Sequence, residues 1–428
     1  MRHPKERSRW NTGMTRREFI RASAGGALAL SGAGGLLAAC SRASNPNQPI
    51  GGSKSSGTSE LPLARRDHPV TWPIYPDNMP IASNLSPEKN ATLKIYNWEQ
   101  YIYTKVVKDF AAHYGCKFQI STFSDVDEAL AKVRTGQVDF DIYFPDPSLL
   151  GKLVVSKLVR PLNHDYLPNL ANVWPNLQSP FYDVGSRYTV PYTIYTTGIG
   201  WRNDHVPDDI AGMSNPYDIF WNPAYKGKIH LLDDYRETVS MALLKNGITD
   251  INTGDSKLID MARDDLLELV DLVGVKLDTN DYTDLPEGGS WIHQSWSGDL
   301  VSAQYYLPKG TSIKALSYWY PPNGGGVVGQ DNIAILRTGK NPVLAHLFLN
   351  WMLDNKISYS NFVDFNGYQA PMNNVNPDQL VADEVVPRNL ISTVVRPSDF
   401  DSGYTILELS PSVDAAWHSA YQQLQAGV

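Results

Sequence analysis

The chain is poor in cysteine: Cys40 and Cys116 are the only two among 428 residues. One pair leaves at most one disulfide, so a framework of several disulfides cannot hold this fold together. The sequence also lacks the patterns G-x-S-x-G, H-E-x-x-H and G-x-x-x-x-G-K-[ST], which mark serine hydrolases, zinc peptidases and phosphate-binding loops. Its nine histidines show no metal-ligand spacing. We therefore expect no enzyme activity, no cofactor and no bound metal.

Long apolar runs are also few, and the clearest is near the N-terminus. Residues 22–39 are dominated by Gly and Ala, which makes them a poor membrane span. They end in Leu37-Ala38-Ala39 before Cys40, the form of a bacterial lipoprotein cleavage and lipidation box, and Arg16-Arg17 upstream match twin-arginine export signals. The sequence predicts a signal peptide over residues 1–39, a lipid on Cys40, and a location in the periplasm or at the outer face of the cytoplasmic membrane.

Positive charge is scarce after the predicted signal peptide. From Cys40 onward there are 30 basic and 43 acidic side chains, a net charge of −13. This balance disfavours nucleic acid and anionic lipid surfaces as partners and favours cationic ligands. About 390 residues remain, which is enough for two domains of typical size.

The composition changes along the predicted mature chain. Residues 41–60 are rich in Ser, Gly, Asn and Pro and contain too few large apolar groups to fold. The proline-rich stretch that follows predicts an extended wrap without regular structure. Residues 40–90 are therefore expected to form a lipid-anchored flexible tether and wrap, with globular structure from Ala91 onward.

The region after Ala91 alternates between strand and helix patterns, and its first helix ends at Gly115. The predicted strands are residues 92–96, 117–121 and 139–144. A β-α-β-α-β order indicates a parallel sheet covered by helices, and thus the α/β class. Ligands of such sheets bind beyond the carboxyl ends of the strands, so this topology places Trp98 and Asp146 at the same edge.

A second α/β series follows. Its predicted strands are residues 187–191, 197–201, 228–232 and 333–336, and its predicted helices include residues 237–245 and 257–273. A turn-rich segment is expected to join the first two of these strands. The glycines of residues 324–329 are expected to form a flexible segment before Asp331, whose backbone can come close to a ligand.

Acidic and aromatic side chains gather near the predicted strand ends. Asp234 and Glu237 have capping-box spacing, so they either satisfy backbone N–H groups or anchor an ammonium group. Arg236 either orients one of these carboxylates or faces solvent, and Asp331 is a second carboxylate position. Aromatic residues in turn-rich contexts are Trp98, Tyr101, Trp296 and Tyr368. An aromatic box with charged ends suits an aliphatic amine.

Several runs resemble the spermidine/putrescine-binding proteins of bacterial ABC importers. The most specific are Asn97-Trp98-x-x-Tyr101 and Asp233-Asp234-x-Arg236-Glu237, and the similarity extends in the same order over roughly residues 91–428. The resemblance implies a type II periplasmic-binding fold, in which two α/β lobes joined by crossover hinge strands close on a solute. The implied lobes are residues 91–196 plus 329–377, and residues 197–328 plus 378–428.

The resemblance also implies roles for the candidate residues. Asp331 would bind one ammonium group, and Asp234 with Glu237 would bind an amine from the other lobe. Asp146 stands where the family has a small hydroxyl residue and would add a carboxylate. The residues that would line the aliphatic chain are Trp98, Tyr101, Trp296 and Tyr368. Gly329, Ser148 and Leu407 replace a tryptophan, a tyrosine and a glutamine of the family.

Together these features predict a monomeric, lipid-anchored receptor that delivers spermidine or putrescine to the permease of an ABC importer. A second hypothesis keeps this fold but assigns it another small cationic or amino-acid-like solute, because Gly329 and Ser148 depart from the family. A third hypothesis is a surface glycoside hydrolase that uses two of the acids as paired carboxylates.

Overall fold

The computed structural model describes residues 61–124, 126–136 and 139–428. The predicted signal peptide over residues 1–39, Cys40 and the tether up to residue 60 lie outside the described residues. Pro62–Val428 forms one compact unit. Among the helices of the described ranges, none is long and apolar enough to cross a membrane.

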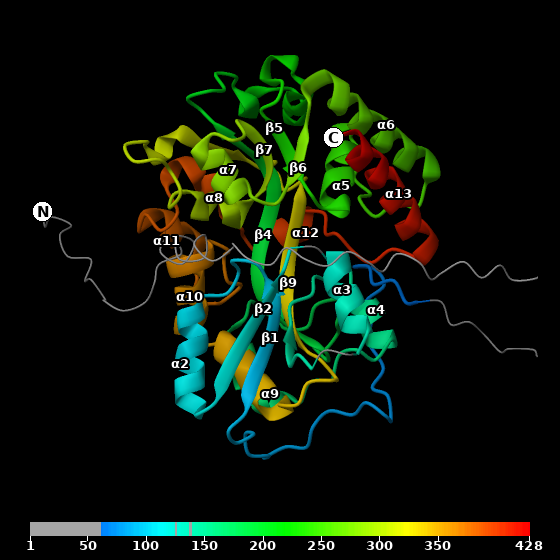
Figure 1. The fold of residues 1–428 in the computed structure, drawn as a ribbon, viewed down its shortest axis with the longest axis vertical. Coiled ribbons are helices and arrows are strands. Elements are labelled where there is room, and N and C mark those ends of the chain that lie inside the picture. Colours follow the sequence, from blue (N-terminus) through cyan, green and yellow to red (C-terminus); the bar gives the residue numbers. More distant parts are fainter. Residues whose placement is uncertain (1–60, 125, 137–138) are drawn as a thin grey trace, which may run out of the picture. The chain divides into compact units, whose positions relative to one another are not determined.

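Within the described residues, nine strands form one sheet. Their order along the sheet is β2-β1-β3-β9-β4-β7-β5-β6, and β8 pairs with β4 at the side. The strands are β1 (Thr92–Trp98), β2 (Lys117–Phe123), β3 (Ile142–Tyr143), β4 (Thr189–Arg202), β5 (Ile229–Leu232), β6 (Lys276–Asp278), β7 (Ile292–Trp296), β8 (Leu316–Trp319) and β9 (Val327–Ile335). In Figure 1, β4 and β9 run between β1 and β2 below and β5, β6 and β7 above.

The two ends of the sheet are parallel. β1 pairs in parallel with β2 and β3, and β5 pairs in parallel with β6 and β7. Leu93 and Ile95 of β1 are fully buried, as expected for a parallel strand covered on both faces. The predicted β-α-β-α-β series is therefore confirmed. Its first helix also ends as predicted, at Gly115, whose φ of 66° favours glycine.

The middle of the sheet differs from the prediction. The expected turn-rich join between residues 191 and 197 is replaced by continuous strand, because β4 runs unbroken from Thr189 to Arg202. The first part of β4 pairs with β9, and its second part pairs with β7 and β8. Residues 192–197 are all aromatic or β-branched, and such residues favour extended backbone over a turn.

The glycines before Asp331 also differ from the prediction. β9 already begins at Val327 and is buried along its whole length. Gly329 therefore lies inside a strand, and the expected flexible segment is wrong at this position. Gly324 does lie in the turn before β9, where it adopts a φ of 77°.

Helices cover the sheet and complete its apolar cores (Figure 1). They are α2 (Thr104–Tyr114), α3 (Val126–Arg134), α4 (Leu150–Val155), α5 (Tyr235–Lys245), α6 (Ser256–Val273), α7 (Asp281–Glu287), α8 (Ser297–Ala303), α9 (Pro342–Met352), α10 (Asn355–Asn361), α11 (Pro377–Ala382), α12 (Asp399–Ser402) and α13 (Pro411–Gly427). One buried cluster includes Ile95 of β1 and Phe348 of α9. A second includes Leu231 of β5 and Trp417 of α13, a helix that packs on α5 and α6.

The proline-rich segment before β1 packs on this unit. Trp72 is only 1% exposed, and its indole donates to the carbonyl of Tyr182 at 2.7 Å. The guanidinium of Arg187 in turn donates to the carbonyl of Trp72 at 2.7 Å. Further along the segment, Asp77 forms an ion pair with Lys157 at 2.8 Å.

Candidate functional site

Trp98 and Asp146 follow neighbouring parallel strands. Trp98 is the last residue of β1, and Asp146 lies three residues beyond the end of β3. Both side chains therefore come from the same edge of the sheet, as the sequence predicts. The Oδ1 atom of Asp146 accepts the backbone N–H of Ser148 at 2.6 Å, which fixes the carboxylate in a turn.

Asp234 and Glu237 lie at the start of α5, which follows β5 directly. Oδ1 of Asp234 accepts the backbone N–H groups of Arg236 and Glu237 at 2.8 and 3.0 Å, so Asp234 caps the helix. Glu237 is 3% exposed, and its Oε1 accepts the Trp296 indole at 3.0 Å and the Thr197 hydroxyl at 3.1 Å. Its Oε2 is buried and has no hydrogen-bond partner among the described residues. The capping role thus belongs to Asp234, while Glu237 keeps a buried acceptor.

Arg236 is bonded to groups outside this pair of acids. Its guanidinium donates to the carbonyl of Leu407 at 2.8 Å and to Oδ1 of Asn252 at 2.7 Å. It also lies over the ring of Trp417, 4.7 Å from the centroid, and is only 4% exposed. Both alternatives predicted for Arg236, orienting a carboxylate and facing solvent, are therefore wrong.

Asp331 lies on β9 and contacts Tyr101, which follows β1. The Tyr101 hydroxyl donates to Oδ2 of Asp331 at 2.5 Å and also contacts the hydroxyl of Thr193. The Tyr101 ring packs edge-on against Tyr368, with centroids 5.0 Å apart. The Tyr368 hydroxyl donates to Asp299 at 3.0 Å. Tyr368 is thus held in place by the Tyr101 ring and by Asp299.

Tyr195 is a site residue that the sequence analysis did not identify. It lies opposite Gly329 in the register of β4 and β9. A Cβ atom on residue 329 would come within 2.5 Å of the Tyr195 ring, so this ring fills the space that a larger side chain there would take. The ring packs edge-on against Trp296 and Tyr368, with centroid distances of 6.4 and 6.1 Å.

The acidic side chains of the site raise one another's pKa values. Burial raises the pKa of Glu237 to about 8, and the charge of Asp234 adds to this effect. Burial raises the pKa of Asp331 to about 7, and the charges of Asp146 and Asp234 raise it further, although one hydrogen bond opposes them. Burial likewise raises the pKa of Asp234 to about 6. A bound cation would lower all three values, because opposite charge favours the ionised form.

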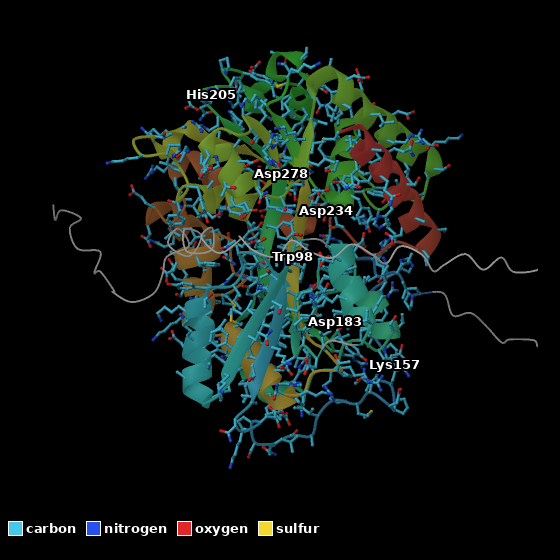
Figure 2. All side chains as sticks on the ribbon, viewed as in Figure 1. Trp98, Lys157, Asp183, His205, Asp234 and Asp278 are labelled. Atoms are coloured by element: carbon cyan, nitrogen blue, oxygen red, sulfur yellow. The ribbon has the colours of Figure 1, made fainter. Side chains whose placement is uncertain are left out.

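A cavity of about 120 Å³ lies between the two halves of the sheet. Trp98 and Ser124 line it from one half, and Asp234, Thr279 and Trp296 line it from the other. In Figure 2, Trp98 and Asp234 lie at the level where the two halves meet. The Trp98 indole N–H is buried and has no hydrogen-bond partner among the described residues. Like the unpaired oxygen of Glu237, this donor is available to a polar ligand.

The structure brings the predicted site residues together in two sets. Trp98, Asp234 and Trp296 line the cavity, and Glu237 is hydrogen-bonded to Trp296. Tyr101, Asp331 and Tyr368 form the second set, which does not line that cavity, and the Tyr195 ring links it to Trp296. Asp146 is linked to Asp331 and Asp234 through its charge. Such an arrangement can hold an elongated cation, because carboxylates accept charge-assisted hydrogen bonds from nitrogen and ring faces cover methylene groups. That these side chains bind a ligand remains a prediction.

Comparison with known proteins identifies similar chains. The spermidine/putrescine-binding periplasmic protein of Escherichia coli (strain K12) is 28% identical over 300 residues, which cover 70% of this chain and 82% of the relative. The putrescine/cadaverine-binding protein of Pseudomonas aeruginosa is 25% identical over 268 residues, 62% of this chain and 75% of the relative.

Solved structures show the same fold. The substrate-binding protein PotD of Streptococcus pneumoniae, from a spermidine/putrescine ABC transporter, superposes with a TM-score of 0.63 at 21% identity, over 79% of this chain and 99% of its own. The TpPotD lipoprotein of Treponema pallidum gives a TM-score of 0.65 at 17% identity, over 78% of this chain and 99% of its own. The fold is therefore that of the periplasmic solute-binding proteins.

The family described as bacterial extracellular solute-binding protein matches residues 105–386, well over half of the chain. This match includes most of the sheet and most of the candidate site. The chain therefore belongs to the bacterial extracellular solute-binding protein family.

Proposed function

We propose that this protein captures spermidine or putrescine outside the cytoplasm and delivers it to an ABC importer. The observation that carries the proposal is the cluster of buried acids from both halves of the sheet. The pKa values of Asp234, Asp331 and Glu237 are raised to about 6, 7 and 8, and a bound polycation would stabilise their ionised forms. The names of the relatives support the same class of ligand.

Binding would use both halves of the sheet. Asp331 would accept one ammonium group, and Asp234 with Glu237 would accept another from the opposite half. Aromatic rings would cover the methylene groups between the two nitrogens. No bond is made or broken, so the protein would act as a receptor and not as an enzyme, in keeping with a family of solute-binding proteins.

The proposed receptor is monomeric and tethered. A lipid on Cys40 would hold it at the outer face of the cytoplasmic membrane, close to the permease that receives the solute. The tetrad Leu37-Ala38-Ala39-Cys40 supports this part of the proposal.

A different solute is the second candidate, and Tyr195 is the observation that favours it. Its ring occupies the space next to Gly329. In the family that this sequence resembles, a tryptophan stands at the position of Gly329. An aromatic ring that comes from β4 instead of β9 would change the shape of the surface that contacts the solute. Another small cation or an amino-acid-like compound would then fit better than spermidine.

Titration calorimetry distinguishes the two candidates. Tag-free protein should release or absorb heat with spermidine or putrescine at one ligand per chain, and its melting temperature should rise with the same compounds. Lysine and arginine serve as amino-acid comparisons. Binding of these without polyamine binding would favour the second candidate, and no response to any amine would contradict both.

Replacing Tyr195 by alanine should weaken polyamine binding by about 2-fold to 30-fold. A favourable contact between a cation and a ring is worth about 0.5–2 kcal/mol, and the ring lies among the four acids, whose charges raise the pKa of Tyr195 beyond the effect of burial. Calorimetry measures the change, with Tyr195→Phe as the matched control that keeps the ring. Equal affinity in Tyr195→Ala and the wild type would contradict the role of Tyr195.

A rescue variant tests whether Gly329 and Tyr195 share one space. Combining Tyr195→Gly with Gly329→Trp removes the ring from β4 and supplies one from β9. Because a side chain at 329 would meet the Tyr195 ring at 2.5 Å, only the combined variant should recover affinity. Gly329→Trp alone should lose stability, since both rings would compete for the same volume.

A further inference from the structure

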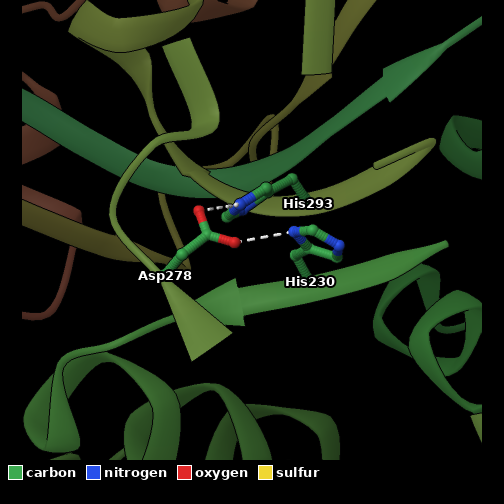
Figure 3. A group of neighbouring side chains, drawn as sticks. All are labelled: His230, Asp278 and His293. Atoms are coloured by element: carbon green, nitrogen blue, oxygen red, sulfur yellow. Dashed lines mark hydrogen bonds and ion pairs between the residues drawn. The ribbon is translucent and has the colours of Figure 1, made fainter. Parts of the chain in front are cut away.

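His230, Asp278 and His293 form a cluster on three neighbouring strands. His230 lies on β5, Asp278 ends β6 and His293 lies on β7, and His230 is directly opposite His293 in the parallel pairing of β5 and β7. The two histidines are 3% and 0% exposed. Figure 3 shows the carboxylate of Asp278 between the two imidazole rings. None of the three belongs to the proposed solute site.

The facing atoms of the cluster are all of the kind that binds metals. Nδ1 of His230 lies 2.7 Å from one oxygen of Asp278, and Nε2 of His293 lies 3.2 Å from the other. One such atom from each residue lies within 4.8 Å of those of the other two. A second carboxylate is close by, since Oδ2 of Asp284 is 3.6 Å from Nδ1 of His230.

The hydrogen bond that Nδ1 of His293 makes determines whether Nε2 of the same ring carries a hydrogen. Nδ1 of His293 lies 2.6 Å from the carbonyl oxygen of Gln294. A carbonyl only accepts, so Nδ1 must carry the hydrogen. In a neutral ring, Nε2 is then a bare lone pair that faces a carboxylate oxygen of Asp278. Two acceptors at this distance repel unless a cation lies between them, either a proton or a metal ion.

His230 can adopt the same state. Its Nε2 has no hydrogen-bond partner among the described residues. Moving the ring hydrogen to Nε2 gives up the hydrogen bond from Nδ1 to Asp278, and a metal ion bound to both atoms would replace that bond. Two bare imidazole nitrogens and a carboxylate suit Zn²⁺, which binds histidine and carboxylate ligands at about 2.0–2.2 Å. A ligand histidine that donates its other N–H to a backbone carbonyl is also a common feature of such sites.

We propose that His230, Asp278 and His293 bind one divalent transition-metal ion of the Zn²⁺ type, and that the nearby negative charge of Asp284 strengthens this binding. Asp278 is 18% exposed at its side chain and Asp284 is 38% exposed, which gives the ion a route from solvent. The ion would link β5, β6 and β7. Thr279, the residue after Asp278, lines the cavity of the proposed solute site, so the ion would brace one wall of that cavity.

No local motif marks this site, because its ligands come from separate strands and are far apart in the chain. Metal sites are recognised in sequences by ligands a few residues apart. Here the ligands become neighbours only through the parallel pairing of β5 with β6 and β7.

Direct metal binding tests the proposal. Tag-free full-length protein is stripped with a chelator and titrated with Co²⁺, which gives strong visible absorption in a four-coordinate site, and then with Zn²⁺ in a calorimeter. We expect one ion per chain, displacement of Co²⁺ by Zn²⁺, and a higher melting temperature with Zn²⁺. His293→Gln should weaken Zn²⁺ binding by more than about 100-fold, because loss of an outer partner alone costs about 10-fold to 100-fold.

Two further variants keep the test clear if His293→Gln fails to fold. Asp284→Asn changes a partly exposed side chain and should weaken Zn²⁺ binding while the protein stays folded, as judged by circular dichroism. His205→Gln, a surface histidine (Figure 2), is the matched control and should bind Zn²⁺ like the wild type. Absence of stoichiometric binding, or equal loss in the control, would overturn the proposal. So would an NMR titration in which His293 is an imidazolium at neutral pH in the presence of excess Zn²⁺.

Discussion

Replacing Asp331 by asparagine should weaken the binding of spermidine or putrescine by about 10-fold to 150-fold. A hydrogen bond to a charged group is worth about 1.5–3 kcal/mol, and each 1.4 kcal/mol corresponds to about tenfold in affinity. Asp331 is 8% exposed, so little water would replace a lost ammonium contact. Asparagine keeps an oxygen that can accept the Tyr101 hydroxyl, and the fold should therefore persist. Titration calorimetry measures the affinity, and thermal unfolding checks the fold.

The matched control is Asp271→Asn, which changes an exposed carboxylate on α6. It makes the same change in formal charge, so it shows how much of any loss reflects the charge of the whole protein. Wild-type affinity in Asp331→Asn would count decisively against the proposed site. Equal weakening in both variants would assign the effect to long-range attraction.

Polyamine affinity should fall by at least about tenfold for each pH unit between pH 7 and pH 5. In the ligand-free protein, burial holds the pKa values of Asp234, Asp331 and Glu237 at about 6, 7 and 8. A bound ammonium group lowers these values, so a protonated carboxyl must release its proton before it can bind. Affinity is therefore greatest above the highest of the three values and decreases as pH falls through them. Calorimetry at several pH values measures the slope.

Two controls distinguish the titration of the protein's carboxyl groups from the titration of the ligand's amines. Aliphatic amines have pKa values of about 10, so the ligand keeps its charge throughout this range. Heats measured in buffers of different ionisation enthalpy count the protons released on binding. Asp331→Asn should release fewer protons than the wild type. An affinity that stays constant from pH 8 to pH 5 would show that the acids are ionised before the ligand arrives.

The start of α5 could be predicted because its signals are local. Asp234 follows an apolar strand and stands three residues before Glu237, a spacing that favours a helix N-terminus. The helix begins at Tyr235, two residues before the predicted start at residue 237. The parallel order of the first three strands could also be predicted, since it depends on the alternation of strands and helices. In both cases the interactions that decide the structure connect residues that lie near one another in the chain.

The part of the site on β4 could not be predicted, because the sequence predicts a turn-rich join over residues 192–196, where the structure has continuous strand. Because side chains in a strand point to alternate faces, Thr193, Tyr195 and Thr197 all lie on the same face of β4. Thr193 contacts Tyr101, and Thr197 donates to Glu237. The available signal was the run of β-branched and aromatic residues. Which of them would meet the acids depends on the register of β4 with β9, which a single sequence does not reveal.

The unbroken course of β4 has a consequence for how the protein loses its structure. Of the three apolar cores, Ile194 belongs to one and Ile199 to another, so a single strand contributes to both. Local unfolding of either core would remove packing contacts from β4 and so weaken the other core as well. The unit should thus melt as one cooperative body, and a proteolytic fragment that ends inside β4 would leave both cores incomplete.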